Sequence, residues 1–266
     1  SALASKASGY PIARVTAKIA VGMTLEEISI ANTNAAFEPK LDYVVTKLPR
    51  FPFDKFASAA NILGTQMKAT GEVMGIGSTL TECLLKSVRS LETGVCHLHL
   101  SKFDNMSADE LLSYISRFKD DNIFAIAQLF RLGVETTKLH DVTMISELFL
   151  LAVKEITDFE IKLKAKIKDR DLLFEAKKLG FSDKFIAKLW GTNEIDIFEM
   201  RKREKIFPVY RMVETSHTDA YIPYFYSSYQ GENKSIRSDR KKIIVLGAGP
   251  IRIGQGVEFD YSTVHA

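Results

Sequence analysis

The spacing of apolar residues divides the chain into three zones, of which the first, residues 1–92, alternates helix and strand signals. Apolar side chains at helical spacing predict an amphipathic helix near residues 12–20. A β-branched run at residues 43–46, closed by Pro49, and a glycine-bracketed run at residues 70–78 each predict a strand. This zone is therefore expected to belong to an α/β domain.

The second zone, residues 93–215, has helical periodicity and hardly any strand signal. Amphipathic helices are predicted over residues 106–118, 124–133, 144–163 and 172–180. Because consecutive helices without intervening strands must bury their apolar faces against one another, we expect a helical bundle inserted between two α/β pieces.

Four residues mark where some of these helices begin and end. Thr79 and Glu82 have the spacing of a capping box, in which each side chain accepts a hydrogen bond from the other residue's backbone N–H. Gly133 and Gly180 directly follow apolar-periodic segments, where glycine commonly adopts the left-handed conformation that closes a helix. We therefore expect a helix to begin after Thr79 and others to end before the two glycines.

The third zone follows a loop rich in Tyr, Ser, Asn and Gly at residues 226–240, which predicts a linker. The apolar run at residues 243–246 is long enough for one buried strand. A glycine-rich stretch follows, with Gly247, Gly249, Gly254 and Gly256. A strand leading into such a turn is typical of the opening of a nucleotide-binding α/β domain.

The glycine-rich stretch matches neither common nucleotide-binding motif completely. Gly247 and Gly249 fit the dinucleotide-binding pattern, but Arg252 stands at its third glycine position. In the phosphate-binding loop pattern, Gln255 stands where a lysine is needed and Gly256 where a hydroxyl is needed. The alternatives that remain are a nicotinamide site, as in a dehydrogenase, and a purely structural turn.

Residues 183–205 resemble a helix-turn-helix, with Gly191 in the turn and a basic end to the second helix. Such a motif would bring Arg201 and its basic neighbours near DNA phosphates. Acidic residues at the start of the second helix, including Glu194, oppose this interpretation, because that end would face the DNA. A solvated helical hairpin is the structural alternative.

No catalytic group or metal site is predicted from residue spacing. Cys96, His97 and His99 crowd together without the paired spacing of a structural zinc site. No Ser/His/Asp or Cys/His arrangement and no carboxylate pair stands out. The sequence pattern by itself therefore predicts an architecture without assigning an active site.

Composition and charge narrow the class of protein. In 266 residues, 46% are hydrophobic and 26% charged, which is ordinary for a globular protein. The net charge of +3 suggests neither a nucleic-acid nor a membrane partner, and no apolar run approaches the length of a membrane span. Two cysteines and no signal segment predict a cytoplasmic protein.

Four stretches, in order, resemble the large subunit of carbamoyl phosphate synthetase. They are SALASKASGYPIA at residues 1–13, AAFEPKLDYVVTKLPRFPFDKF at 35–56, TQMKATGEVMGIGSTLTECLLKSVRSLE at 65–92 and GPIRIGQGVEFDYSTVHA at 249–266. The helical zone is similar more loosely, through GFSDKFIAKLWG and FPVYRMVET. The resemblance covers nearly the whole chain.

The resemblance implies that the chain is an internal piece with a mixed fold. Residues 1–92 would be the C-terminal part of the ATP-grasp domain that forms carboxyphosphate, an α/β domain. Residues 93–235 would be an all-α oligomerisation domain with a linker. Residues 236–266 would be the first strand and turn of the second α/β half, which forms carbamoyl phosphate.

The family's activity is implied in the same way. The parent enzyme would be an ATP-dependent ligase that makes carbamoyl phosphate from bicarbonate, glutamine-derived ammonia and two ATP, for arginine and pyrimidine biosynthesis. ATP, Mg²⁺ or Mn²⁺, and K⁺ are its expected cofactors, a glutaminase small subunit its expected partner, and the helical domain its homo-oligomeric contact. This piece alone is expected to be inactive, and to bind none of those cofactors.

The resemblance also implies a passage for carbamate between two separate active sites. By position, Glu72 and Glu258 would be acidic residues of this tunnel, with Arg252 and Gly256 beside the same passage. The structural alternative is that Gly256 only satisfies a backbone turn and Glu258 only caps a helix.

Overall fold

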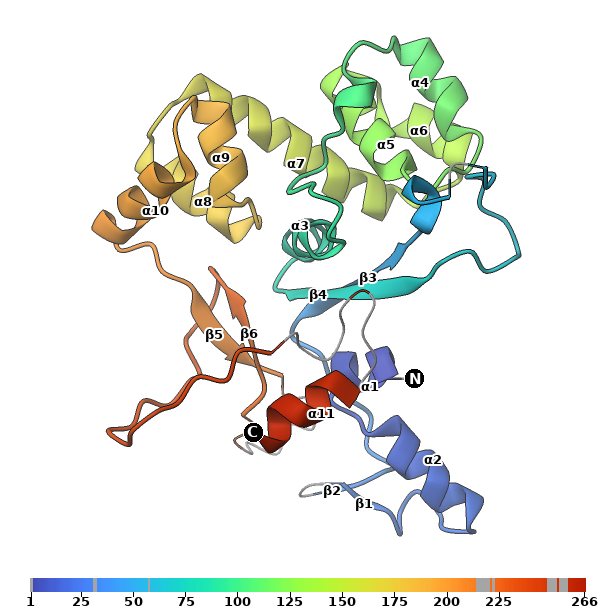
Figure 1. Ribbon diagram of the computed structural model, residues 1–266, viewed down its shortest axis with the longest axis vertical. Coiled ribbons are helices and arrows are strands. Elements are labelled where there is room, and N and C mark those ends of the chain that lie inside the picture. The colour runs from blue at the N-terminus through green and yellow to red at the C-terminus, as the bar shows by residue number, and fades with distance from the viewer. Residues whose placement is uncertain are drawn as a thin grey trace.

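The computed structural model of the protein describes, apart from the side chains of residues 2, 54 and 258–260, residues 2–30, 33–56, 58–213, 221, 223–247, 253 and 258–266. In these parts the chain is a mixture of helices and three small antiparallel sheets (Figure 1). No helix among them combines the length and the apolar character that a bilayer crossing requires.

The N-terminal part contains helices α1 (Ala2–Ser8) and α2 (Ile12–Ala20) and the short antiparallel strands β1 (Ser29–Ile30) and β2 (Thr33–Asn34). One face of α2 is buried through Val15, which belongs to a small separate core with residues of the β1–β2 segment. The amphipathic helix predicted near residues 12–20 is confirmed.

A two-stranded ribbon of β3 (Val44–Arg50) and β4 (Gly71–Gly77) follows, and α3 (Leu80–Ser90) packs across it (Figure 1). A Cβ atom at Gly75 would lie 2.4 Å from the Cys83 carbonyl oxygen. Only glycine therefore allows the ribbon and the helix to approach this closely.

Both strands predicted in the first zone are confirmed, with one difference in extent. β3 does not end before Pro49 but continues through it, with Pro49 opposite Glu72. A two-stranded ribbon tolerates this proline because each strand has an outer edge, where the missing N–H needs no partner.

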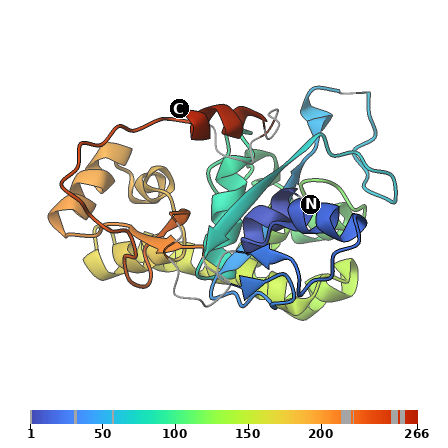
Figure 2. The same ribbon diagram turned by 90° about the horizontal axis from the view of Figure 1, so that it is seen from below.

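The helical zone is built around its longest helix, α7. Its helices are α4 (Ala108–Ile115), α5 (Asn122–Arg131), α6 (Thr136–Thr143), α7 (Glu147–Ala165), α8 (Arg170–Lys178), α9 (Asp183–Trp190) and α10 (Glu194–Arg203). The group α4–α6 gathers at one end of α7 and the group α8–α10 at the other (Figure 1). From below, the two groups lie on opposite sides of the β3–β4 ribbon (Figure 2).

One apolar core joins α3 to both groups of helices. Its most completely buried large side chains are Phe103, Phe181, Leu85, Leu98, Leu111, Ile115, Leu129, Leu139, Leu150, Ile156 and Leu163. The four predicted amphipathic helices correspond to α4, α5, α7 and α8, so their periodicity identified the faces that meet.

The predicted glycine caps are confirmed, and the predicted capping box is half confirmed. Gly133 and Gly180 have φ angles of 82° and 91°, directly after α5 and α8. The Thr79 side chain accepts from the Glu82 N–H at 3.2 Å, but the Glu82 carboxylate accepts from the Ser78 N–H at 2.8 Å. Glu82 therefore binds the backbone one residue earlier than the motif predicts.

The expectation of an all-α segment over residues 93–235 is wrong in one region. Strands β5 (Val209–Met212) and β6 (Phe225–Ser228) pair antiparallel within it. At four residues each, these strands are too short to give a clear alternation of apolar and polar positions. Helix α6 was also not predicted, because its sequence TTKLHDVT carries little apolar periodicity.

The strand predicted at residues 243–246 is not formed. Residues 241–247 have no strand partner among the described residues, and Ile243 and Leu246 are 92% and 93% exposed. An apolar run becomes a strand only where a neighbouring strand takes its backbone hydrogen bonds. The last described element is helix α11 (Glu258–His265).

Candidate functional site

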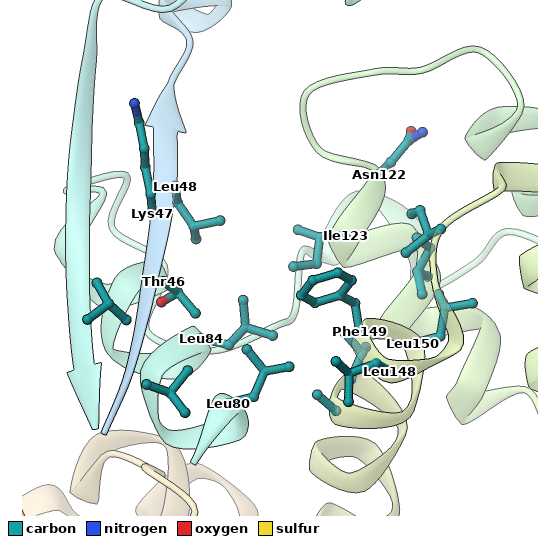
Figure 3. Close-up of a pocket in the computed structure, with 16 residues that line it drawn as sticks. Thr46, Lys47, Leu48, Leu80, Leu84, Asn122, Ile123, Leu148, Phe149 and Leu150 are labelled. Carbon is teal, nitrogen blue, oxygen red and sulfur yellow. The ribbon is translucent and has the colours of Figure 1, made fainter. Parts of the chain in front are cut away.

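An apolar groove of about 640 Å³ lies between the β3–α3 unit and helices α5 and α7 (Figure 3). Leu80 and Leu84 of α3 face Leu148 and Phe149 of α7 across it. Its polar lining residues are Thr46 and Lys47 on β3 and Asn122 at the start of α5. The groove is therefore suited to an apolar surface and offers few groups to a charged ligand.

The sequence at the start of α7 explains why the groove is open. In ELFLLAV, consecutive residues point about 100° apart, so one apolar face cannot hold them all. Leu150 is buried in the chain's own core, whereas Leu148, Phe149 and Leu151 are 65%, 53% and 50% exposed. A contiguous group of exposed large apolar side chains is typical of a contact surface.

A cluster of buried polar groups joins α3 to the β5–β6 pair. The Glu82 side chain is almost completely buried, with Lys86 Nζ 2.8 Å from its Oε1 atom. Ser228 of β6 donates a hydrogen bond to Glu82 Oε2 at 3.1 Å. Lys86 also donates to the backbone carbonyls of Ile76 and Ser227, so one lysine ties β4, α3 and β6 together.

Residues 183–205 form the helical hairpin α9–α10, with Gly191 in the left-handed conformation between the helices. Arg201 donates to Asp183 Oδ2 from Nη2 at 2.6 Å, and is buried. Lys177 donates to Asp183 Oδ1 at 2.8 Å, and burial lowers the pKa of this lysine to about 8 although Asp183 opposes the shift. Arg201 is thus part of the protein interior, which opposes the helix-turn-helix alternative, and the helical hairpin is the arrangement that forms.

His97, one of the three closely spaced residues that lack the spacing of a zinc site, is a core residue. His97 stacks on Phe185 with ring centroids 3.5 Å apart, and its Nε2 lies 2.9 Å from Glu160 Oε1. Arg131 donates to the same carboxylate at 2.8 and 2.9 Å. Burial lowers the pKa of His97 to about 4, so Glu160 accepts from a neutral imidazole. Burial opposes ionisation of Glu160, but the hydrogen bonds from Arg131 and His97 hold its pKa below the ordinary value.

The neighbouring residues do not form a metal centre. His99 Nε2 lies 2.9 Å from Asp104 Oδ1, away from the buried pair of His97 and Glu160. Within the described ranges, no group of three or more His, Cys, Asp or Glu side chains could hold a metal ion. Cys83 is buried beside the Val44 carbonyl, and burial raises the pKa of its thiol to about 12.

Of the four tunnel residues implied by the resemblance, Glu72 is the one whose side chain is described. It lies on β4 and forms an ion pair with Lys47 of β3. Arg252 and Gly256, like most of the glycine-rich stretch, lie outside the described residues, and only the backbone of Glu258 is described, as the start of α11. Ile253 contacts the strand next to Glu72, because a Cβ at Gly71 would lie 3.2 Å from its Cδ1 atom.

Together, the fold and the groove define a helical domain with an open apolar face, joined to a small α/β segment. A family model described as carbamoyl-phosphate synthetase large chain, oligomerisation domain, matches residues 72–205. A second, described as carbamoyl phosphate synthase preATP-grasp domain, matches residues 239–266. The first match spans half of the chain, and the protein belongs to the carbamoyl phosphate synthetase large-chain family.

Sequence reasoning missed the three buried ion clusters, around Glu82, Asp183 and Glu160, and the groove. The spacing of Glu82 and Lys86 on one helix predicts a pair, but not its burial under β6. Asp183, Lys177 and Arg201 come from three helices, and no local pattern shows that they meet. The run of apolar residues at the start of α7 was the available signal for the groove.

Proposed function

We propose that the chain works as part of a glutamine-hydrolysing carbamoyl phosphate synthase, in which its helical zone provides self-association and connects the neighbouring α/β parts. The main support is the oligomerisation-domain match over residues 72–205, together with the open apolar groove, most of whose lining residues lie in that range. The match at residues 239–266 belongs to another domain of the same large chain.

In the proposed reaction of the whole enzyme, bicarbonate is phosphorylated by one ATP, ammonia displaces phosphate to give carbamate, and a second ATP phosphorylates carbamate. A glutaminase small subunit supplies the ammonia, and the product enters arginine and pyrimidine biosynthesis. Mg²⁺ or Mn²⁺ and K⁺ would assist the phosphoryl transfers by neutralising charge. We assign none of these ligands to residues of this chain, which by itself is expected neither to hydrolyse ATP nor to bind it tightly.

Self-association is expected to bury the exposed side of α7. Leu148, Phe149 and Leu151 expose at least half of their surface, and covering them removes apolar area from water, which favours association. Sedimentation velocity at high micromolar concentration should show a species larger than the monomer. A strict monomer under these conditions would count against the proposal.

The substitution Phe149→Asp tests the surface itself. Placing a carboxylate within an apolar contact should weaken self-association by about tenfold or more, because the charge loses its hydration on association. Ile195→Asp is the matched control, since Ile195 is 59% exposed on α10, outside the groove. If both variants associate like the original chain, the groove is not the contact.

We further propose that Glu72, Arg252, Gly256 and Glu258 line a passage for carbamate. The contact of Ile253 with Gly71 supports this, because these two residues are sequence neighbours of Arg252 and Glu72. The alternative, in which Gly256 only satisfies a turn and Glu258 only caps α11, makes no demand on the size of residue 256.

The substitution Gly256→Phe in the intact enzyme separates these alternatives. If Gly256 lines a passage, carbamoyl phosphate synthesis should fall at least about tenfold further than bicarbonate-dependent ATP hydrolysis, because the first site still works. Gly64→Phe is the control, since a Cβ at Gly64 would meet open space. Equal loss of both activities, or unfolding of the variant, would remove support for the tunnel assignment.

A further inference from the structure

A polar pocket of about 240 Å³ lies where α3 meets the start of α9 and the end of β6. Lys86 and Arg89 reach it from α3, and Lys177 reaches it from α8. Glu82 and Asp183 lie beside these cations. The pocket is distinct from the apolar groove, and no step of the proposed reaction uses it.

The three cations are not equally paired. Lys86 and Lys177 each contact a carboxylate at 2.8 Å, and each also donates to a backbone carbonyl. Arg89 donates from Nη1 to the Gly180 carbonyl at 2.7 Å, and the described residues provide it with no carboxylate within 4.0 Å. The described residues provide no hydrogen-bond acceptor for its Nε and Nη2 donors, which leaves both free for a ligand.

The charges around the pocket also indicate a cation without a counter-charge. The charges that line the pocket balance, with Lys86, Arg89 and Lys177 against Glu82, Asp183 and Glu194. Arg201 lies outside the lining but pairs with Asp183, and including it leaves one positive charge. Burial raises the pKa of the adjacent Tyr229 phenol, so it adds no negative charge. Burial also lowers the pKa of Arg89, but a guanidinium keeps its proton in proteins. A partly buried cation without a counter-charge is unfavourable, and an anion would relieve this.

We propose that this pocket binds one small planar monoanion of the carboxylate class, held by the Nε and Nη2 donors of Arg89. A carboxylate accepts two parallel hydrogen bonds from a guanidinium, whereas a lysine offers no such fork. The volume accommodates an anion of a few non-hydrogen atoms with water, and the single excess charge favours a monoanion over a dianion. Bicarbonate, acetate and formate belong to this class.

Thermal unfolding of the chain in sodium acetate tests anion binding without requiring synthetase activity. Against sodium chloride at equal ionic strength, saturating acetate should raise the Tm by about 2–4 °C, because it binds the folded state alone. Sodium bicarbonate should act similarly, and sodium phosphate less. Equal Tm values in acetate and chloride, or a larger increase in phosphate than in acetate, would overturn the proposal.

Variants locate the site. Arg89→Gln should abolish the difference in Tm between acetate and chloride, whereas Lys184→Gln, which removes an exposed positive charge outside the pocket, should keep it. Arg89→Lys keeps the charge but loses the fork, so it should lose at least about half of the shift; it also serves if Arg89→Gln does not fold. A full shift in either Arg89 variant would show that acetate binds elsewhere.

Discussion

At its first turns α7 leaves Leu148 and Phe149 at least half exposed in the groove and Leu151 half exposed outside it, whereas its later turns bury Ile156 and Leu163. The Trp190 indole covers that far end and donates to the Leu163 carbonyl at 2.8 Å. One helix thus carries surplus apolar surface at its start and a sealed core with paired charges further along. The first region is suited to a partner, and the second to a fixed internal arrangement.

The largest change in the free energy of unfolding is expected when one partner of a buried ion pair is removed from the sealed region. Arg131→Met would leave Glu160 buried with only His97 as its partner, so the free energy of unfolding should fall by about 3–5 kcal/mol. Urea denaturation would measure this loss. Arg203→Met is the control, because Arg203 is 71% exposed and its ion pair with Glu204 should contribute little. Equal effects of the two variants would contradict the comparison.

The pH dependence of stability should distinguish the sealed region further, because His97 is buried there. Its pKa of about 4 in the folded chain lies below the ordinary value of about 6.5, because burial disfavours the charged ring. As the pH falls from about 6.5 to 4, the unfolded state binds a proton that the folded state does not. Stability should therefore fall by about 2–3 kcal/mol over this window.

The histidine responsible can be identified by substitution. Denaturation curves of His97→Gln between pH 7 and 4 should lose most of this dependence, leaving the contributions of Glu160 and other carboxylates at the acid end. His99→Gln should keep it, because His99 is partly exposed beside Asp104. A His97 variant with an unchanged pH dependence would show that another group is responsible.

The smallest effect is expected at the open end of α7. Leu148→Ser should change the free energy of unfolding of the monomer by less than about 0.5 kcal/mol, since this side chain is 65% exposed. Urea denaturation at a concentration too low for association would show this. A loss of 2 kcal/mol or more would mean that the groove belongs to the core of the monomer and is not surplus surface.

Periodicity identified the parts of the fold in which local sequence and tertiary environment agree. Helices α5 and α8 have clear apolar faces and glycine caps at Gly133 and Gly180, so both their existence and their ends could be predicted. The apolar run at residues 243–246 did not form the predicted strand, because strand formation depends on a partner strand that local sequence does not reveal. Helix α6 was missed for the opposite reason, since tertiary packing of Leu139 stabilises a segment with a weak pattern.

The candidate sites depended even more on distant contacts. Glu82 was recognised as a helix-start residue, but its bond with Ser228 joins positions 146 residues apart. No role could be predicted for His97, because Glu160 and Arg131 are far from it in sequence. The tunnel assignment of Glu72 came from the family resemblance alone, since one glutamate on a strand carries no such information.

Helix α7 connects the group α4–α6 to the group α8–α10, and this has a mechanical consequence. With 19 residues, α7 is about 28 Å long, and no proline or glycine interrupts it. A rod of this length that tilts by about 1° at its start displaces its far end by roughly 0.5 Å. A partner that contacts Phe149 and tilts α7 would therefore also displace Leu163 at the other end of the helix, where Trp190 bonds to its carbonyl.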